Sequence, residues 1–302
     1  MAKTKAKNTE DAYISQDRAG NNPHIYNPNN AEERKKIFEN LEQQIRDNPD
    51  NPSPYYQQGI LFLAEGNPAK AVECLDKSRE KSAESEKKGT RSNFPQTNDL
   101  LNWLGRAYVG VKQFDNAIGA YEECIKTKPN SSDAYIQLAT LYFNFQRGDD
   151  AIQVLEKAIE RGIKDPAVYN LLGFIFIVIN KPDDAAYTLE YAKKLNKKSS
   201  AISEPITNNL AAAYIKMKRT EDAIKLYDDE IKKTPKTLSY YANLAQIYGA
   251  AKRYDDARRV LEDLDKINTF PDNAKIIKAK LQELDGLKKS EKALQKEKTK
   301  PK

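Results

Sequence analysis

Residues 98–131 read NDLLNWLGRAYVGVKQFDNAIGAYEECIKTKPNS, and a pattern of small and bulky residues in this segment recurs along the chain. Its fixed points are Gly105, Tyr108 and Ala117, with the glycine twelve residues and the tyrosine nine residues before the alanine. Five other segments keep this spacing, with glycine or alanine first and an aromatic second; their alanines are Ala71, Ala151, Ala185, Ala223 and Ala257. A repeat of this kind indicates one helical hairpin that is copied and stacked.

The period of the pattern is that of a helix–turn–helix unit. Successive alanines are 46, 34, 34, 38 and 34 residues apart, so two steps contain insertions of 12 and 4 residues. Bulky residues recur at helical spacing on both helices of each unit. We expect the small residue of the first helix to face the alanine of the second, where the backbones approach. The predicted hairpins span 52–85, 98–131, 132–165, 166–199, 204–237 and 238–271.

These residues give the chain a family resemblance. Trp103-Leu104-Gly105 with Tyr108, Ala117, Tyr121 and Pro129 resembles the pattern of tetratricopeptide repeat (TPR) proteins, and the resemblance covers roughly residues 52–271. It implies an all-α, right-handed α-solenoid of about six hairpins that works through protein–protein interaction. Glu230 and Leu264 depart from the small residue expected late in the second helix, which predicts looser or differently angled packing in the last two hairpins.

The segments outside the repeats are predicted to be caps and tails. Residues 29–50 contain Ile37, Leu41 and Ile45 at a spacing of four, which indicates one helix that covers the open end of the first hairpin. Residues 272–287 are predicted to form a polar C-terminal capping helix. Residues 1–28 and 288–302 are predicted to be disordered tails.

The net charge of +6 lies at the ends of the chain. Residues 288–302 hold seven lysines and two glutamates, and residues 1–28 hold four basic and three acidic residues, so the repeats are near neutral. A neutral body argues against specific nucleic-acid binding. The basic tail suggests at most weak contact with acidic surfaces. The polar N-terminus predicts a cytoplasmic protein; an exported protein without its signal peptide would look similar.

Catalytic and metal-binding chemistry is not expected. The single histidine, His24, lies in the N-terminal tail, and the repeats contain no phosphate-binding glycine loop or metal-binding pair. Cys74 and Cys124 are interpreted as small packing residues rather than a disulfide. We therefore predict a protein that is not an enzyme and that has no metal and no cofactor.

The concave face, lined by the first helices, is the predicted partner-binding groove. Side-chain amides occur two or three residues before the small residue, and they suit the backbone of a bound peptide because they both donate and accept. Apolar residues occur one and four residues after it. The predicted groove residues are Asn102, Arg106, Gln137, Thr140, Phe143, Asn170, Phe174, Ile177, Asn208, Asn209, Asn243 and Gln246.

One helix leaves two interpretations open. Residues 168–179 are apolar on nearly every side, which fits either tight packing by both neighbours or an exposed trough with Phe143, Phe174, Ile177 and Val178 as its floor. The hypothesis from sequence is a non-enzymatic scaffold or adaptor that binds a peptide or helix of a partner protein. The alternative is a peripheral membrane-complex assembly factor that uses the lysine-rich tail. A chaperone-type carboxylate clamp is not supported, because Arg106 is the only cation at the corresponding positions.

Overall fold

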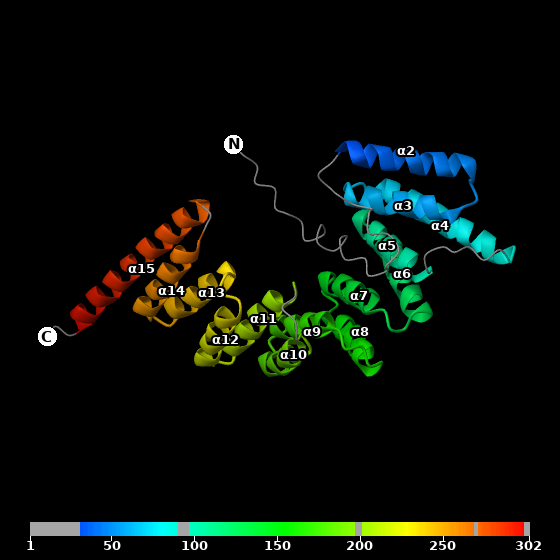
Figure 1. Cartoon of the computed structure of the whole chain (residues 1–302). Helices are drawn as coiled ribbons and strands as arrows, with labels where there is room; N and C mark the ends of the chain where they lie inside the picture. The colour runs from blue at the N-terminus through cyan, green and yellow to red at the C-terminus, as the bar shows by residue number, and fades with distance from the viewer. Residues whose placement is uncertain (1–30, 90–96, 197–200, 269–270, 299–302) are drawn as a thin grey trace. The chain divides into compact units, whose positions relative to one another are not determined.

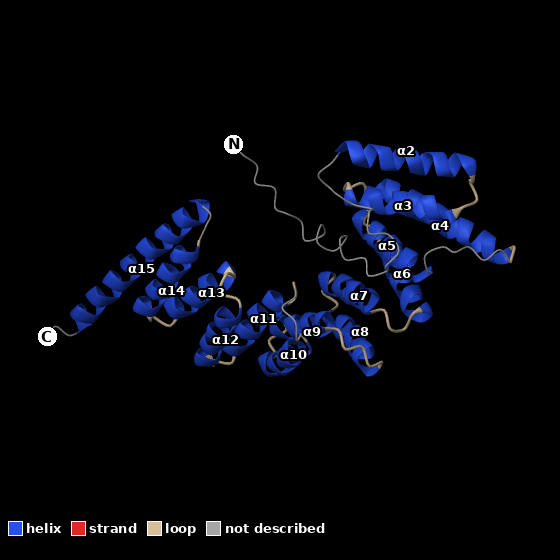
Figure 2. Ribbon diagram, in the orientation of Figure 1, coloured by secondary structure: helices blue, strands red, loops and turns tan. Residues whose placement is uncertain are grey.

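The computed structural model describes residues 31–89, 97–196, 201–268 and 271–298 (Figures 1 and 2). Within these ranges the chain consists of fourteen helices and their turns, without strands. The predicted tail 1–28, and residues 299–302 of the predicted tail 288–302, lie outside the described residues. Helices that follow one another along the chain pack as successive hairpins, which confirms the predicted all-α repeat architecture. The chain divides into two compact units, residues 1–163 and 164–302, and each is described by itself.

Unit 1 contains a single helix followed by three hairpins. Each helix packs against the next one in the chain, so the core is a continuous layer between neighbouring helices. The helix that begins at Pro68 is longer than the other hairpin helices of this unit, because the first of the two insertions extends it. The helices are α2 (Ala31–Asp47), α3 (Pro52–Ala64), α4 (Pro68–Lys87), α5 (Thr97–Gly110), α6 (Phe114–Thr127), α7 (Ser132–Asn144) and α8 (Gly148–Glu160).

Unit 2 contains three hairpins and a long terminal helix. Its helices are α9 (Pro166–Val178), α10 (Pro182–Leu195), α11 (Ser203–Lys216), α12 (Thr220–Lys233), α13 (Leu238–Ala250), α14 (Tyr254–Ile267) and α15 (Pro271–Lys298). α15 packs on α14 through buried Ile277 and Leu284. It continues to Lys298, so the prediction of a cap ending at 287 and a disordered segment from 288 is wrong for residues 288–298. These residues are mostly Lys, Glu, Ala, Leu and Gln, which all favour helix.

The two helices of a hairpin approach most closely at the small residue of the first helix. A Cβ built on Gly105 would lie 2.5 Å from the ring of Tyr121, and one on Gly59 or Gly173 would lie 2.5 Å from Leu75 or Leu189. The glycine therefore faces the bulky residue that lies four positions after the repeated alanine of the second helix. The expectation was that the glycine would face the alanine itself. The bulky side chain reaches back over the preceding turn of its own helix, as helical side chains do.

Every hairpin turn has the same backbone conformation. The residue seven positions after the small one is left-handed, with φ between 60° and 72°; these residues are Gly66, Lys112, Gln146, Asn180, Lys218 and Lys252. The next residue donates its backbone N–H to the carbonyl of the repeated aromatic, as Arg147 does to Tyr142 at 2.9 Å. This bond caps the first helix and fixes the direction in which the second helix begins.

The two departures from the small-residue column are both buried. Leu264 packs in the core of unit 2. Glu230 lies between Lys193 of α10 and Lys233 of its own helix, and it accepts a hydrogen bond from each, at 2.9 Å for Lys233. At Glu230 an ion-paired carboxylate thus replaces the close apolar contact of the other repeats.

Candidate functional site

In unit 1 the predicted groove residues form a polar cluster on the first helices α5 and α7. The amide of Asn102 donates to one carboxylate oxygen of Asp133, and the amide of Gln137 donates to the other at 3.4 Å. The guanidinium of Arg106 lies 4.6 Å above the ring of Trp103. Asp133 was not predicted as a site residue, although its place four residues before Gln137 puts both on one helix face.

In unit 2 the predicted amides pair with each other across neighbouring first helices. Asn209 of α11 donates to Asn170 of α9 at 3.0 Å, and Asn243 of α13 donates to Asn208 of α11 at 3.0 Å. Asn208 also accepts a hydrogen bond from the hydroxyl of Tyr227 at 3.0 Å. Burial raises the pKa of Tyr227 to about 12, against a smaller opposite effect of Asn243, so this hydroxyl stays a donor at neutral pH.

Apolar side chains are exposed beside these amides. Phe174 and Val178 on α9 are 38% and 52% exposed, and Ile215 on α11 is 44% exposed. Phe174 and Val178 follow Asn170 by four and eight residues, and Ile215 follows Asn208 by seven. Each set therefore lies on one side of its helix. Because α9 contacts α11, amides and apolar side chains share one surface. We call it the first-helix face of unit 2.

The structure divides helix 168–179 between the two interpretations that the sequence left open. Val168, Leu172 and Ile175 are buried, whereas Phe174, Val178 and Ile179 are exposed. Ile177 is 8% exposed and belongs to the core of unit 2. The prediction that Ile177 lines the groove is therefore wrong, since this side chain supports the surface from beneath.

The remaining predicted residues differ in exposure. Gln246 on α13 is exposed, whereas Thr140 and Phe143 on α7 are half-buried. Phe143 lies in unit 1 and Phe174 in unit 2, so each is placed only within its own unit. Ile215 was not among the twelve predicted groove residues, and Val178 was named only as part of the floor of the alternative trough. Sequence alone could not show that these two side chains are exposed, because exposure depends on which neighbouring helices cover each side of an apolar helix.

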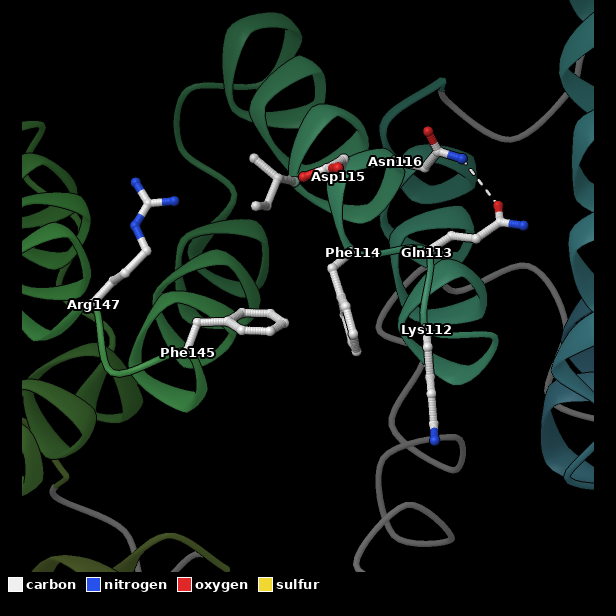
Figure 3. A pocket seen from close by; sticks show the side chains of 8 residues that line it. Lys112, Gln113, Phe114, Asp115, Asn116, Phe145 and Arg147 are labelled. Carbon is white, nitrogen blue, oxygen red and sulfur yellow. Dashed lines mark hydrogen bonds between the residues drawn. The ribbon is translucent and has the colours of Figure 1, made fainter.

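Unit 1 also has an open depression of about 630 Å³ at the turns α5–α6 and α7–α8 (Figure 3). The rings of Phe114 and Phe145 extend toward one another there, with centroids 4.7 Å apart in an edge-to-face arrangement. Arg147 at its border is bound to Asp150 at 2.6 Å and lies over the ring of Tyr142. The pattern of repeated columns did not predict this depression, because turn residues lie outside the columns.

The described residues bear on two expectations, that of no metal site and that of the two cysteines as packing residues. Within the ranges that the structure describes, no three His, Cys, Asp or Glu side chains lie together in a way that could hold a metal ion. Cys124 is fully buried, and burial raises the pKa of its thiol to about 11. Cys74 is half-buried, and burial raises its pKa as well. Neither cysteine forms a disulfide within the described residues. His24 lies outside the described residues.

Comparison with protein families decides what kind of repeat this is. Tetratricopeptide repeat models match residues 56–132, 108–173, 207–239 and 237–264, which together cover more than half of the chain. The chain belongs to the tetratricopeptide repeat family. Proteins of this family mediate protein–protein interactions, so the TPR hairpins imply protein partners. A comparison with curated proteins finds no match.

Solved structures with the same TPR fold share little sequence with this chain. A tetratricopeptide repeat protein from Parabacteroides merdae is 16% identical, with a TM-score of 0.54 over 86% of this chain and 90% of that one. Yeast Tom70 is 17% identical, with a TM-score of 0.52 over 84% of this chain and 59% of that one. The Cut9–Hcn1 structure of the APC/C is 18% identical, with a TM-score of 0.54; the match covers 83% of this chain but only 46% of that chain. At these identities the likeness shows the fold alone.

The lysine-rich end of this TPR protein takes part in the fold. Lys288 of α15 pairs with Asp255 of α14, and Lys252 pairs with Glu291 at 2.9 Å. None of the helices in the described part of the chain is long and apolar enough to cross a lipid bilayer.

Proposed function

We propose that this protein is a non-enzymatic adaptor that holds a segment of a partner protein on the first-helix face of unit 2. The single observation that carries the proposal is that Phe174, Val178 and Ile215 are exposed on the same helix sides as the paired amides. Large apolar side chains that share an exposed surface favour protein contact, since their burial by a partner removes apolar area from water.

The paired amides leave capacity for a bound backbone. A side-chain amide has two N–H donors and an oxygen with two lone pairs, whereas each amide–amide bond uses one donor and one lone pair. Pairing also holds the amides in fixed positions, which lowers the entropy cost of binding. In this proposal the exposed apolar side chains supply affinity, and the amides orient the main chain of the partner segment.

The experiment compares two aspartate variants in a pull-down with mass spectrometry. Phe174→Asp places a charge in the proposed surface. Tyr187→Asp places the same charge on α10, a second helix, at a residue that is 79% exposed. We expect Phe174→Asp to lose partners that the wild type and Tyr187→Asp both retain, with helix content by circular dichroism equal in all three. Retention of every wild-type partner by a folded Phe174→Asp variant would refute the proposal.

A further inference from the structure

A second depression lies in unit 1 and shares no residue with the first-helix face of unit 2. It has a volume of about 410 Å³ and lies between the second helices α6 and α8, with residues of α7 as its floor. Ile125, Leu138 and Val154 give it apolar walls. Its volume is within the range of small-molecule sites, which are mostly apolar with a few polar groups.

One of those polar groups is a buried donor without an acceptor. Tyr135 on α7 is 0% exposed and lines the depression, and within the described residues its hydroxyl has no hydrogen-bond partner. An unsatisfied buried hydroxyl is unfavourable, and each such group calls for an explanation. Burial raises the pKa of Tyr135, and the charge of Arg161, which lines the same depression, acts in the opposite direction.

The same position in two other hairpins shows what Tyr135 lacks. Tyr55 donates to the carbonyl of Pro49 at 3.3 Å, and Tyr241 donates to the carbonyl of Pro235 at 3.1 Å. In both cases the proline precedes the tyrosine by six residues. Pro129 precedes Tyr135 by six residues, yet the bond is not made, and Pro129 lines the depression instead. The buried hydroxyl without a hydrogen-bond partner thus occurs in a hairpin that also lines a depression.

The rim of the depression is positively charged. Lys126, Lys157 and Arg161 lie around it, and none of them forms an ion pair with another residue in the described ranges. The acidic group at the rim, Glu122, accepts a hydrogen bond from Tyr142 at 3.5 Å. An apolar cavity with a buried donor and a cationic rim matches an apolar molecule that carries one anionic head group.

We propose that this depression is a binding site for an amphipathic carboxylate. The alkyl part lies against Ile125, Leu138 and Val154. One carboxylate oxygen accepts the hydroxyl hydrogen of Tyr135, and the planar guanidinium of Arg161 matches the other oxygen, as guanidinium groups do with carboxylates. Lys126 and Lys157 add charge at the rim. The site is independent of the proposed partner surface in unit 2.

The experiment measures binding of octanoate to the full chain by titration calorimetry, with octan-1-ol as the uncharged comparison. We expect the wild type to bind octanoate more tightly than octanol, with an affinity that falls as salt rises. Tyr135→Phe keeps the ring and removes the donor, so octanoate affinity should fall roughly tenfold, as for a hydrogen bond to a charged group. Arg161→Gln should lower it as well.

Two control variants separate the site from other effects. Tyr241→Phe removes a hydroxyl at the equivalent position in unit 2, so it should lower stability and leave octanoate binding unchanged. Phe174→Asp should also leave octanoate binding unchanged, which keeps this test distinct from that of the partner surface. Equal binding of octanoate by the wild type and Tyr135→Phe, or no preference of the wild type for octanoate over octanol, would overturn the proposal.

Discussion

At the scale of single residues, the left-handed turn positions are a source of strain. Five of the six are occupied by Lys, Gln or Asn, and only Gly66 is a glycine. A side chain in this conformation brings its Cβ close to the following carbonyl oxygen, which glycine avoids. The turns are nevertheless identical, because stacking of neighbouring hairpins requires the two helices to meet at the same angle each time.

We expect Gln146→Gly to stabilise the protein by about 0.5–1 kcal/mol, because the relief of steric strain exceeds the entropy that glycine loses on folding. The matched control is Gln153→Gly at an exposed position inside α8, which should destabilise the protein by about 1 kcal/mol through lower helix propensity. Urea unfolding followed by circular dichroism measures both changes. A destabilised Gln146→Gly variant would show that the turn is not strained.

A second residue-scale prediction concerns close approach in the second hairpin. Gly105→Ala places a methyl group 2.5 Å from the ring of Tyr121, which is fully buried and cannot move away. We expect a loss of about 1–3 kcal/mol in the free energy of unfolding. Gly119→Ala in α6 meets nothing within 4 Å and should stabilise by up to about 1 kcal/mol. If both alanines stabilise equally, the proximity of α5 and α6 is wrong.

At the scale of helices, the repeated tyrosine joins one hairpin to the one before it. Tyr108 donates to Asp76 of α4 at 3.0 Å, and Tyr214 donates to Glu190 of α10 at 2.7 Å. The same tyrosine column is covered by arginines, as Arg219 lies 4.7 Å from the ring centre of Tyr214. The aromatic therefore packs within its hairpin through the ring and binds the neighbouring hairpin through the hydroxyl.

The link between α10 and α12 through Glu230 predicts a pH dependence. Burial alone would raise the pKa of Glu230, but hydrogen bonds from Lys193 and Lys233 outweigh it and lower the pKa below its ordinary value. A lowered folded-state pKa means that the contribution to stability is present above the unfolded-state value near 4.5 and is lost as pH falls through the folded-state pKa.

We expect Glu230→Gln to destabilise the protein by roughly 1–2 kcal/mol at pH 7, because two charge-assisted hydrogen bonds are weakened. The difference from the wild type should shrink as pH falls below 4.5, since the wild-type carboxylate is then protonated. Urea unfolding at a series of pH values measures this. Glu156→Gln at an exposed position of α8 is the control and should show no such trend. A constant difference at all pH values would contradict the assigned ion pair.

At the scale of the whole molecule, positive charge is concentrated at one end of the chain. Residues 288–302 carry a net charge of +5 out of a total of +6. Within unit 2, the helical part of this segment is held to the last hairpin by exposed ion pairs of Lys288 with Asp255 and of Glu291 with Lys252. Exposed pairs contribute little stability, so the segment can be removed without unfolding the unit.

Deletion of residues 288–302 should therefore lower helix content only by the removed end of α15 and leave partner capture unchanged, because the first-helix face of unit 2 remains complete. Pull-down with mass spectrometry and sedimentation with acidic vesicles compare the deletion with the full chain. If the full chain sediments with acidic vesicles and the deletion loses both vesicles and partners, the basic segment rather than the first-helix face carries the function. That result would favour the membrane-complex alternative.

The sequence by itself determined the repeat, the helices and their family. Gly105, Tyr108, Ala117 and their five copies recur at fixed distances because each hairpin must satisfy the same packing requirement, so a linear pattern records it. The columns also placed Asn170, Asn208 and Asn243 at neighbouring positions on first helices, but they did not predict the hydrogen bonds between the amides. The sequence underestimated the length of α15, because the helix formers after residue 287 were interpreted by their charge alone.

The tertiary structure alone decided which apolar residues are exposed. Phe174, Ile177 and Val178 are equally apolar in sequence, yet Ile177 is buried while Phe174 and Val178 face outward. The exposure of a side chain depends on which side of its helix is covered by a neighbouring helix. For α9 the neighbours are α10 and α11, which cover it only in the folded chain. The orphan hydroxyl of Tyr135 is of the same kind, since Tyr55 and Tyr241 occupy the same column and are satisfied. A repeated pattern of residue types does not record such differences, because the same tyrosine is bonded in two hairpins and not in a third.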